Sequence, residues 1–167
     1  MTLDHMTGGR AGWNVVTSLN DSEAFNMGAK STIQHDRRYD RADEMMQSVI
    51  NMWNSWEPDA IKFDKHSGIF ADPDKVHPIE HNGEWFQTKG SFTVPPSPQG
   101  HPVIVQAGQS GRGRTFACEW GEVIFTIQND MEQAKKVRSE MRDEAQMQGR
   151  DPDTIAIAPA FYVTVGE

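Results

Sequence analysis

A glycine-rich turn carries the strongest chemical signal in this sequence. Residues 106–114 read QAGQSGRGR, and they join an apolar, strand-like run to a helix-like one. Small residues let backbone N–H groups approach a ligand closely, and the positive end of the following helix favours an anion. Ser110 would add a hydroxyl donor, and Arg112 or Arg114 a positive charge. The turn therefore predicts a phosphate site. An ordinary strand-to-helix turn is the alternative, because neither the dinucleotide fingerprint nor the P-loop spacing is present.

Three further side chains could donate hydrogen bonds to a ligand oxygen. His35 and Tyr39 are four residues apart, so they share a helix face if a helix begins early enough to include both. Thr17 follows the strand-like run 13–16, whereas Asn14 would face the other side of that strand unless a bulge intervenes. The alternatives are a capping histidine, a half-buried tyrosine and hydroxyls that merely end a strand.

Two histidines in the middle of the chain raise the question of a metal. His77 and His81 have a spacing that suits zinc on a helix, and Asp72 and Asp74 lie nearby. Pro78 argues against a helix there, so we expect no metal site. The sequence also contains no recognisable Ser/His/Asp or Cys/His set.

The elements that must position these groups alternate between strands and helices. Strand-like runs cover residues 13–16, 102–108, 122–126 and 155–159. Helix-like runs follow them, with an apolar stripe over 42–53, a second helix over 112–119 and a third capped by Asn129 or Asp130. Asp40 is the candidate N-cap of the first helix. Serial alternation predicts an α/β fold with a parallel sheet or barrel, and four such units resemble half of an eight-fold barrel.

Two segments interrupt that alternation. Residues 19–34 lack periodicity and are expected to form a loop. Residues 59–99 are rich in turn signals, with short strands expected at 85–88 and 92–94, and they are too long for an ordinary connection. We therefore predict an insertion over 59–99 that serves as a lid.

Composition narrows the classes of function. The chain has 167 residues and a net charge of −8, which argues against non-specific binding to nucleic acid or to an anionic membrane. No apolar run approaches the roughly 20 residues of a membrane span, and the first residues do not form a secretory signal. Cys118 is the one cysteine, so no internal disulfide is expected. These features favour the cytoplasm.

Longer motifs then suggest a family. Residues 3–18, LDHMTGGRAGWNVVTS, resemble the segment around the fourth strand of the flavin-dependent, bacterial-luciferase-like monooxygenases. The resemblance favours the branch of nitrilotriacetate monooxygenase component A, with dibenzothiophene-sulfone and long-chain alkane monooxygenases as relatives. Residues 70–77 and 95–108 resemble the same branch.

The resemblance implies a fold and an activity. The fold would be a (β/α)₈ TIM barrel, of which residues 1–167 would form about half, approximately strands four to seven. The activity would be that of a two-component monooxygenase, in which reduced FMN and O₂ give a flavin hydroperoxide that oxidises a small organic substrate. A separate NAD(P)H:flavin oxidoreductase would supply the reduced FMN as co-substrate. A half barrel exposes sheet edges, so we expect a homo-oligomer.

The resemblance also assigns residues. His35 is the candidate catalytic residue, as the most plausible titrating residue near the flavin, and Gln109 stands where relatives often have a second serine. The expected FMN-binding residues are Thr17, His35, Tyr39, Gly108, Gln109 and Ser110.

Two other functions stay open. The chain could be a truncated, non-catalytic remnant that binds FMN weakly or only oligomerises. It could also be a different barrel enzyme that uses the same phosphate site for a deazaflavin in a dehydrogenase.

Overall fold

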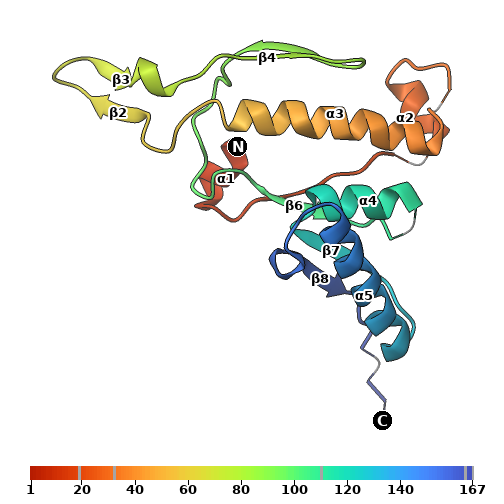
Figure 1. Ribbon diagram of the computed structural model, residues 1–167. Helices are drawn as coiled ribbons and strands as arrows, with labels where there is room; N and C mark the ends of the chain where they lie inside the picture. Colours follow the sequence, from red (N-terminus) through yellow and green to blue (C-terminus); the bar gives the residue numbers. More distant parts are fainter. Residues whose placement is uncertain (19, 32, 110, 164, 167) are drawn as a thin grey trace. The chain divides into compact units, whose positions relative to one another are not determined.

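The computed structural model describes residues 1–18, 20–31, 33–109, 111–163 and 165–166. The chain forms two compact units, and Figure 1 follows the elements along it. One unit consists of Met1–Gly12 and Asp40–Pro102, and the other of Trp13–Tyr39 and Val103–Glu167. In the described part of the chain, no helix combines the length and the apolar content that crossing a bilayer requires.

A four-stranded sheet organises the unit that contains the C-terminal half. Its order is β1-β6-β7-β8, and the β6–β7 and β7–β8 pairs are parallel, as predicted. All four strands were expected, but β1 begins one residue earlier and ends two residues earlier than the predicted run 13–16, and β6 is shorter than the predicted run 102–108. Their bounds are β1 (Gly12–Asn14), β6 (Val103–Gln106), β7 (Val123–Thr126) and β8 (Ala156–Pro159).

Helices follow the strands of this sheet. Helix α4 (Gly111–Trp120) comes after β6, and α5 (Met131–Met147) after β7, which confirms both predicted helices. Asp130 is the N-cap of α5, and its carboxylate accepts a hydrogen bond from the N–H of Gln133 at 2.8 Å. A short 3₁₀ turn, η2 (Pro152–Thr154), then leads into β8.

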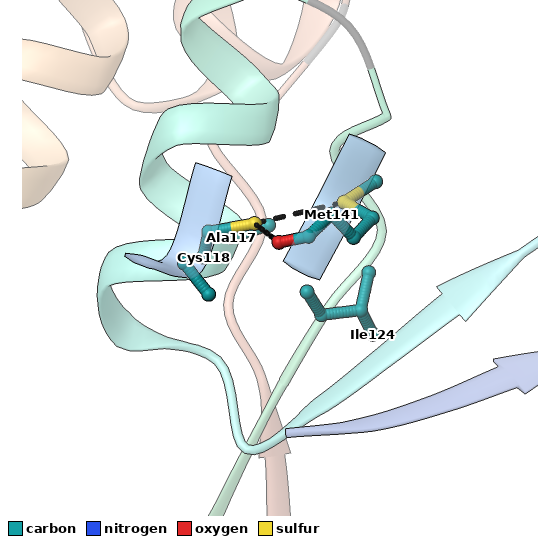
Figure 2. Packing of buried hydrophobic residues seen from close by; sticks show 5 residues of the cluster. Ala117, Cys118, Ile124 and Met141 are labelled. Carbon is teal, nitrogen blue, oxygen red and sulfur yellow. Dashed lines mark hydrogen bonds between the residues drawn. The ribbon is translucent and has the colours of Figure 1, made fainter. Parts of the chain in front are cut away.

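The core of this unit lies where α4, α5 and β7 meet. Its buried side chains are Ala117, Cys118, Ile124, Met141 and Ala145. Figure 2 shows the Cys118 thiol directed at Met141, 3.4 Å from its carbonyl oxygen and 3.6 Å from its sulfur. Burial raises the pKa of this thiol to about 11. Cys118 is therefore a neutral packing residue, not a nucleophile.

The other unit is built from two hairpins, a short helix and most of α3. The hairpins are antiparallel and pair β2 with β3 and β4 with β5. The bounds are α1 (Thr2–Thr7), β2 (Ile61–Asp64), β3 (Ile69–Ala71), η1 (Pro73–Lys75), β4 (Ile79–Asn82) and β5 (Gln87–Gly90).

The predicted hairpin was displaced along the chain. Strands were expected at 85–88 and 92–94, but β5 pairs with β4, which precedes it. The reason is the Asn82-Gly83 turn signal, since the N–H of Gly83 donates to the carbonyl of Phe86 at 2.9 Å and closes the turn there.

Two helical segments also differ from the sequence-based prediction. Helix α2 (Asp21–Asn26) lies within the segment expected to be a loop. Helix α3 (His35–Trp53) begins at His35, so Asp40 lies inside the helix and is not its N-cap. The first turn already forms there, because the N–H of Arg38 donates to the carbonyl of Gln34 at 3.0 Å.

One carboxylate fastens the β4–β5 hairpin to α3. Glu44 accepts hydrogen bonds from the N–H groups of Trp85 and Phe86, at 3.1 and 2.7 Å, and lies 3.2 Å from Nε2 of His81. Burial acts to raise the pKa of Glu44, but these hydrogen bonds outweigh it and hold the pKa below its ordinary value of 4.5. The hairpin is therefore best held when Glu44 is ionised.

A second carboxylate ties α1 to distant segments. Asp4 is fully buried, and its Oδ1 accepts from the N–H of Ala11 at 2.9 Å and from the amide of Gln99 at 2.7 Å. Burial acts to raise the pKa of Asp4, but the hydrogen bonds lower it below its ordinary value of 3.8.

These two carboxylates predict acid sensitivity. Because the native pKa values of Glu44 and Asp4 lie below those of the unfolded chain, their stabilisation is complete above the unfolded values and is lost as the pH falls through the native ones. The urea concentration at the unfolding midpoint should decrease as the pH is lowered from neutral to about 3. In the Glu44→Gln variant this decrease should be smaller. Glu132→Gln, at an exposed position on α5, is the control, and its urea midpoint should depend on pH as that of the unchanged protein does. Equal pH dependence in the Glu44→Gln variant and the unchanged protein would refute the role of Glu44.

Candidate functional site

The turn between β6 and α4 is held by the side chain of Gln106. This residue ends β6 and is 4% exposed. Its Nε2 donates to the carbonyl of Val15 at 2.6 Å. Its Oε1 accepts from the N–H groups of Ala107 and Gly108, at 2.7 and 2.6 Å. The first two N–H groups of the predicted phosphate turn are thus already occupied by Gln106.

Gly108 permits the close approach of α4 to this turn. A Cβ at Gly108 would lie 2.6 Å from the carbonyl carbon of Gly113 and even nearer its oxygen. Both atoms belong to the backbone of the first turn of α4, so no side-chain rotation could relieve the clash. Glycine at 108 is required for the geometry of the turn.

Tyr39 reaches the same place from α3. A Cβ at Gly113 would lie 2.8 Å from the hydroxyl of Tyr39, so this hydroxyl lies directly against the first turn of α4. The ring of Tyr39 packs on the buried Phe116, with centroids 5.5 Å apart. The structure therefore brings Tyr39 and the glycine-rich turn together.

His35 lies beside Tyr39, one turn earlier on α3. Their rings meet edge to face, with centroids 5.2 Å apart, so the predicted shared helix face is present. His35 is exposed, and its Nδ1 lies 2.7 Å from a carboxylate oxygen of Asp36. A neighbouring carboxylate fixes the ring orientation and leaves Nε2 as the nitrogen directed elsewhere.

Gln109 has partners other than a ligand. Its side-chain oxygen accepts from Nε2 of Gln128, beyond β7, at 2.8 Å. Its carbonyl accepts from the guanidinium of Arg114, at 3.0 and 3.1 Å, and Arg114 also pairs with Glu140 at 2.8 Å. The structure thus commits Arg114 to holding the turn, which argues against its suggested role as a phosphate-binding charge.

Thr17 lies just beyond the end of β1 and is half-buried. The N–H of Val15 donates to the carbonyl of Val105 at 3.0 Å, which places this tip beside β6. Thr17 therefore follows a strand neighbouring the one that leads into the glycine-rich turn. Ser110, also expected to contact FMN, lies outside the described residues.

Two residues that hold the candidate site, Gln106 and Phe116, received no role of their own from the sequence, although Gln106 begins the predicted phosphate turn. Phe116 has the pattern of any core aromatic and gave no distinguishing signal. Gln106 did give one, since it closes the otherwise apolar run 103–106. A buried amide must find hydrogen-bond partners, so a glutamine at such a position indicates a specific contact.

A pocket of about 550 Å³ lies beyond the carboxyl ends of β7 and β8. Its lining is mostly apolar and includes Ile127, Met131, Pro159 and Phe161. Of the residues predicted to bind FMN, none that the structure describes lines it.

The histidines considered as metal ligands have other contacts. His77 lies 2.8 Å from Glu57, and His81 contacts Glu44 on α3. Among the described residues, no group of three or more His, Cys, Asp or Glu side chains is arranged to hold a metal ion.

The site is thus a set of strand tips and helix starts of an α/β protein. This is the class in which ligands bind at the carboxyl ends of parallel strands. Residues 1–167 match the family of luciferase-like monooxygenases, and the chain belongs to this family. The family suggested by the sequence motifs is confirmed, as is the α/β fold with a parallel sheet.

Two curated relatives support the predicted branch. The chain is 49% identical over 166 residues to dibenzothiophene-sulfone monooxygenase of Rhodococcus erythropolis, covering 99% of this chain and 37% of that protein. It is 42% identical over 166 residues to nitrilotriacetate monooxygenase component A of Aminobacter aminovorans, again with 99% and 37% coverage. The chain therefore spans 37% of the length of these relatives.

A solved structure agrees with this assignment. The fold matches a riboflavin lyase crystallised with modified FMN and substrate riboflavin, with a TM-score of 0.90 and 42% identity. The match covers 96% of this chain and 36% of the lyase chain.

Proposed function

We propose that this chain supplies FMN-binding strand tips to a two-component, flavin-dependent monooxygenase. Reduced FMN would be the co-substrate, a separate NAD(P)H:flavin oxidoreductase the partner, and a small organic molecule the substrate. The observation that carries the proposal is the position of the Tyr39 hydroxyl against the first turn of α4. Family membership supports it, as does the modified FMN in the crystal structure of the similar lyase.

The residues at the β6–α4 turn suit a flavin phosphate. Helix α4 has ten residues, and the N–H groups of its first turn have no acceptor within the helix. Gly108 and Gly113 allow the β6–α4 turn, the first turn of α4 and the hydroxyl of Tyr39 to lie close together. Tyr39, Thr17 and Ser110 are the proposed side-chain donors.

The roles of the protein follow from these positions. Bound reduced FMN would supply the electrons that activate O₂ for insertion of one oxygen atom into the substrate. The chain would hold the phosphate, orient the ring through His35 and Tyr39, and exclude water from the site. We keep His35 as the candidate catalytic residue beside the flavin, because its Nε2 faces away from Asp36.

The rest of the architecture is proposed on the sequence. The turn-rich segment 59–99 is our candidate for a lid that excludes water. The strands β1, β6, β7 and β8 are our candidates for strands four to seven of a barrel. Self-association that closes the sheet stays a prediction, with sedimentation velocity as its measurement.

The proposal predicts the effect of removing single hydroxyls. Tyr39→Phe and Ser110→Ala should each weaken FMN binding by about 1 kcal/mol, roughly fivefold in the dissociation constant, because each removes one hydrogen bond to the phosphate. Titration followed by flavin fluorescence measures both. Tyr162→Phe is the matched control, since Tyr162 is 89% exposed, and it should bind FMN as the unchanged protein does. FMN affinity that is unchanged in both test variants would remove these residues from the site.

A further inference from the structure

We infer that Gln106 is a positioning residue for the flavin phosphate: its buried amide sets the β6–α4 turn and the tip of β1 in one geometry. The inference rests on the proposed function, since it concerns how that site is held.

The hydrogen bonds of the Gln106 side chain support this role. Its Oε1 has two lone pairs, and both are used by the N–H groups of Ala107 and Gly108. Its Nε2 donates to the carbonyl of Val15, 91 residues away along the chain. At 4% exposure, water cannot replace these partners at little cost.

This arrangement decides which N–H groups can meet a phosphate. Those of Ala107 and Gly108 turn inward to Gln106 and are not available to a ligand. Phosphate donors must therefore come from later in the turn and from the first turn of α4. Gln106 directs the chain there by holding the two residues that lead into it.

The same amide fixes the tip that bears Thr17. Val15, whose carbonyl accepts from Gln106, precedes Thr17 by two residues. One side chain thus sets the relative position of two proposed groups of FMN contacts, one after β1 and one after β6. A change at Gln106 should consequently disturb phosphate binding without touching the ligand.

A further hydrogen bond, between the side chains of two glutamines, connects this turn to the end of β7. Gln109 Oε1 accepts from Gln128 Nε2 at 2.8 Å, and Gln128 lies two residues beyond the end of β7. The tips of β1, β6 and β7 are therefore linked by side-chain amides. The link through Gln106 is the buried one, so it is the link to test.

The test compares FMN with riboflavin, which has the same ring but no phosphate. Gln106→Met keeps the length of the side chain and removes its three hydrogen bonds without adding charge. We expect the FMN dissociation constant to rise at least tenfold and that of riboflavin to change less than twofold. Gln148→Met, at an exposed glutamine after α5, is the control and should alter neither constant.

A milder variant keeps the inference testable if Gln106→Met does not fold. Gln106→Asn retains the amide but shortens the side chain, so it cannot reach Val15 and both N–H groups together. It should also weaken FMN selectively, with circular dichroism confirming that the protein is folded. Equal weakening of FMN and riboflavin, or no weakening, would overturn the positioning role. Failure of the unchanged protein to bind FMN would instead overturn the proposed function.

Discussion

Replacing Gly108 by alanine is expected to disrupt the β6–α4 turn and to weaken FMN binding at least tenfold. The new Cβ would lie 2.6 Å from the carbonyl carbon of Gly113, inside the van der Waals contact distance. Since the obstacle is backbone, α4 itself must move away from β6. Overpacking of this kind lowers the free energy of unfolding by about 1–3 kcal/mol. Urea denaturation and an FMN titration measure the two effects.

The neighbouring glycine provides a graded comparison. Gly113→Ala should lower the free energy of unfolding less than Gly108→Ala does. Its Cβ would meet the hydroxyl of Tyr39, which is a side-chain atom that can shift. Gly166→Ala is the control, since its Cβ would meet nothing within 4 Å. Gly108→Ala with the stability and FMN affinity of Gly166→Ala would contradict the described geometry of the turn.

Phe116→Ala is expected to cause the largest loss of stability, about 3–5 kcal/mol in the free energy of unfolding. Phe116 is fully buried and is the largest fully buried side chain in the part of the protein that the structure describes. Its removal would leave a cavity under the ring of Tyr39, with which it packs at 5.5 Å between centroids. The Tyr39 hydroxyl would then lose its fixed position against α4, so FMN affinity should fall as well.

Two matched variants test this expectation. Phe25→Ala, on α2, removes the same side chain at a position that is 53% exposed, and should change the unfolding free energy by less than about 0.5 kcal/mol. Phe116→Leu should lower the free energy of unfolding less than Phe116→Ala, because leucine fills part of the cavity. This variant replaces Phe116→Ala in the test if the alanine variant does not fold. Similar urea midpoints for Phe116→Ala and Phe25→Ala would contradict the core placement of Phe116.

Local patterns were sufficient for the C-terminal half of the fold. The apolar run before Gln106 predicted β6, and the cap at Asp130 with the stripe through Met141 predicted α5. In both cases the information lies within a few residues. The β4–β5 hairpin was misplaced because two turn signals competed, one at Asn82-Gly83 and one at residues 89–91. Pairing with β4 and the contact with Glu44 decide that the turn closes at Asn82-Gly83.

The candidate site was predictable only in part, for the same physical reason. The four-residue spacing of His35 and Tyr39 predicted their shared face. The contact of Tyr39 with Gly113 and the bond from Gln106 to Val15 join residues far apart in the chain, and no local pattern contains them. The commitment of Arg114 to Gln109 and Glu140 was hidden from the sequence in the same way.

The decisive test of FMN binding is an anaerobic titration of the purified protein with reduced FMN, with reduced deazaflavin in parallel. We expect saturable, micromolar binding of reduced FMN and weaker binding of the deazaflavin. No binding of reduced FMN by a protein that is folded by circular dichroism would contradict the proposed function and favour a non-catalytic remnant. Tighter binding of the deazaflavin would also contradict it, in favour of a dehydrogenase.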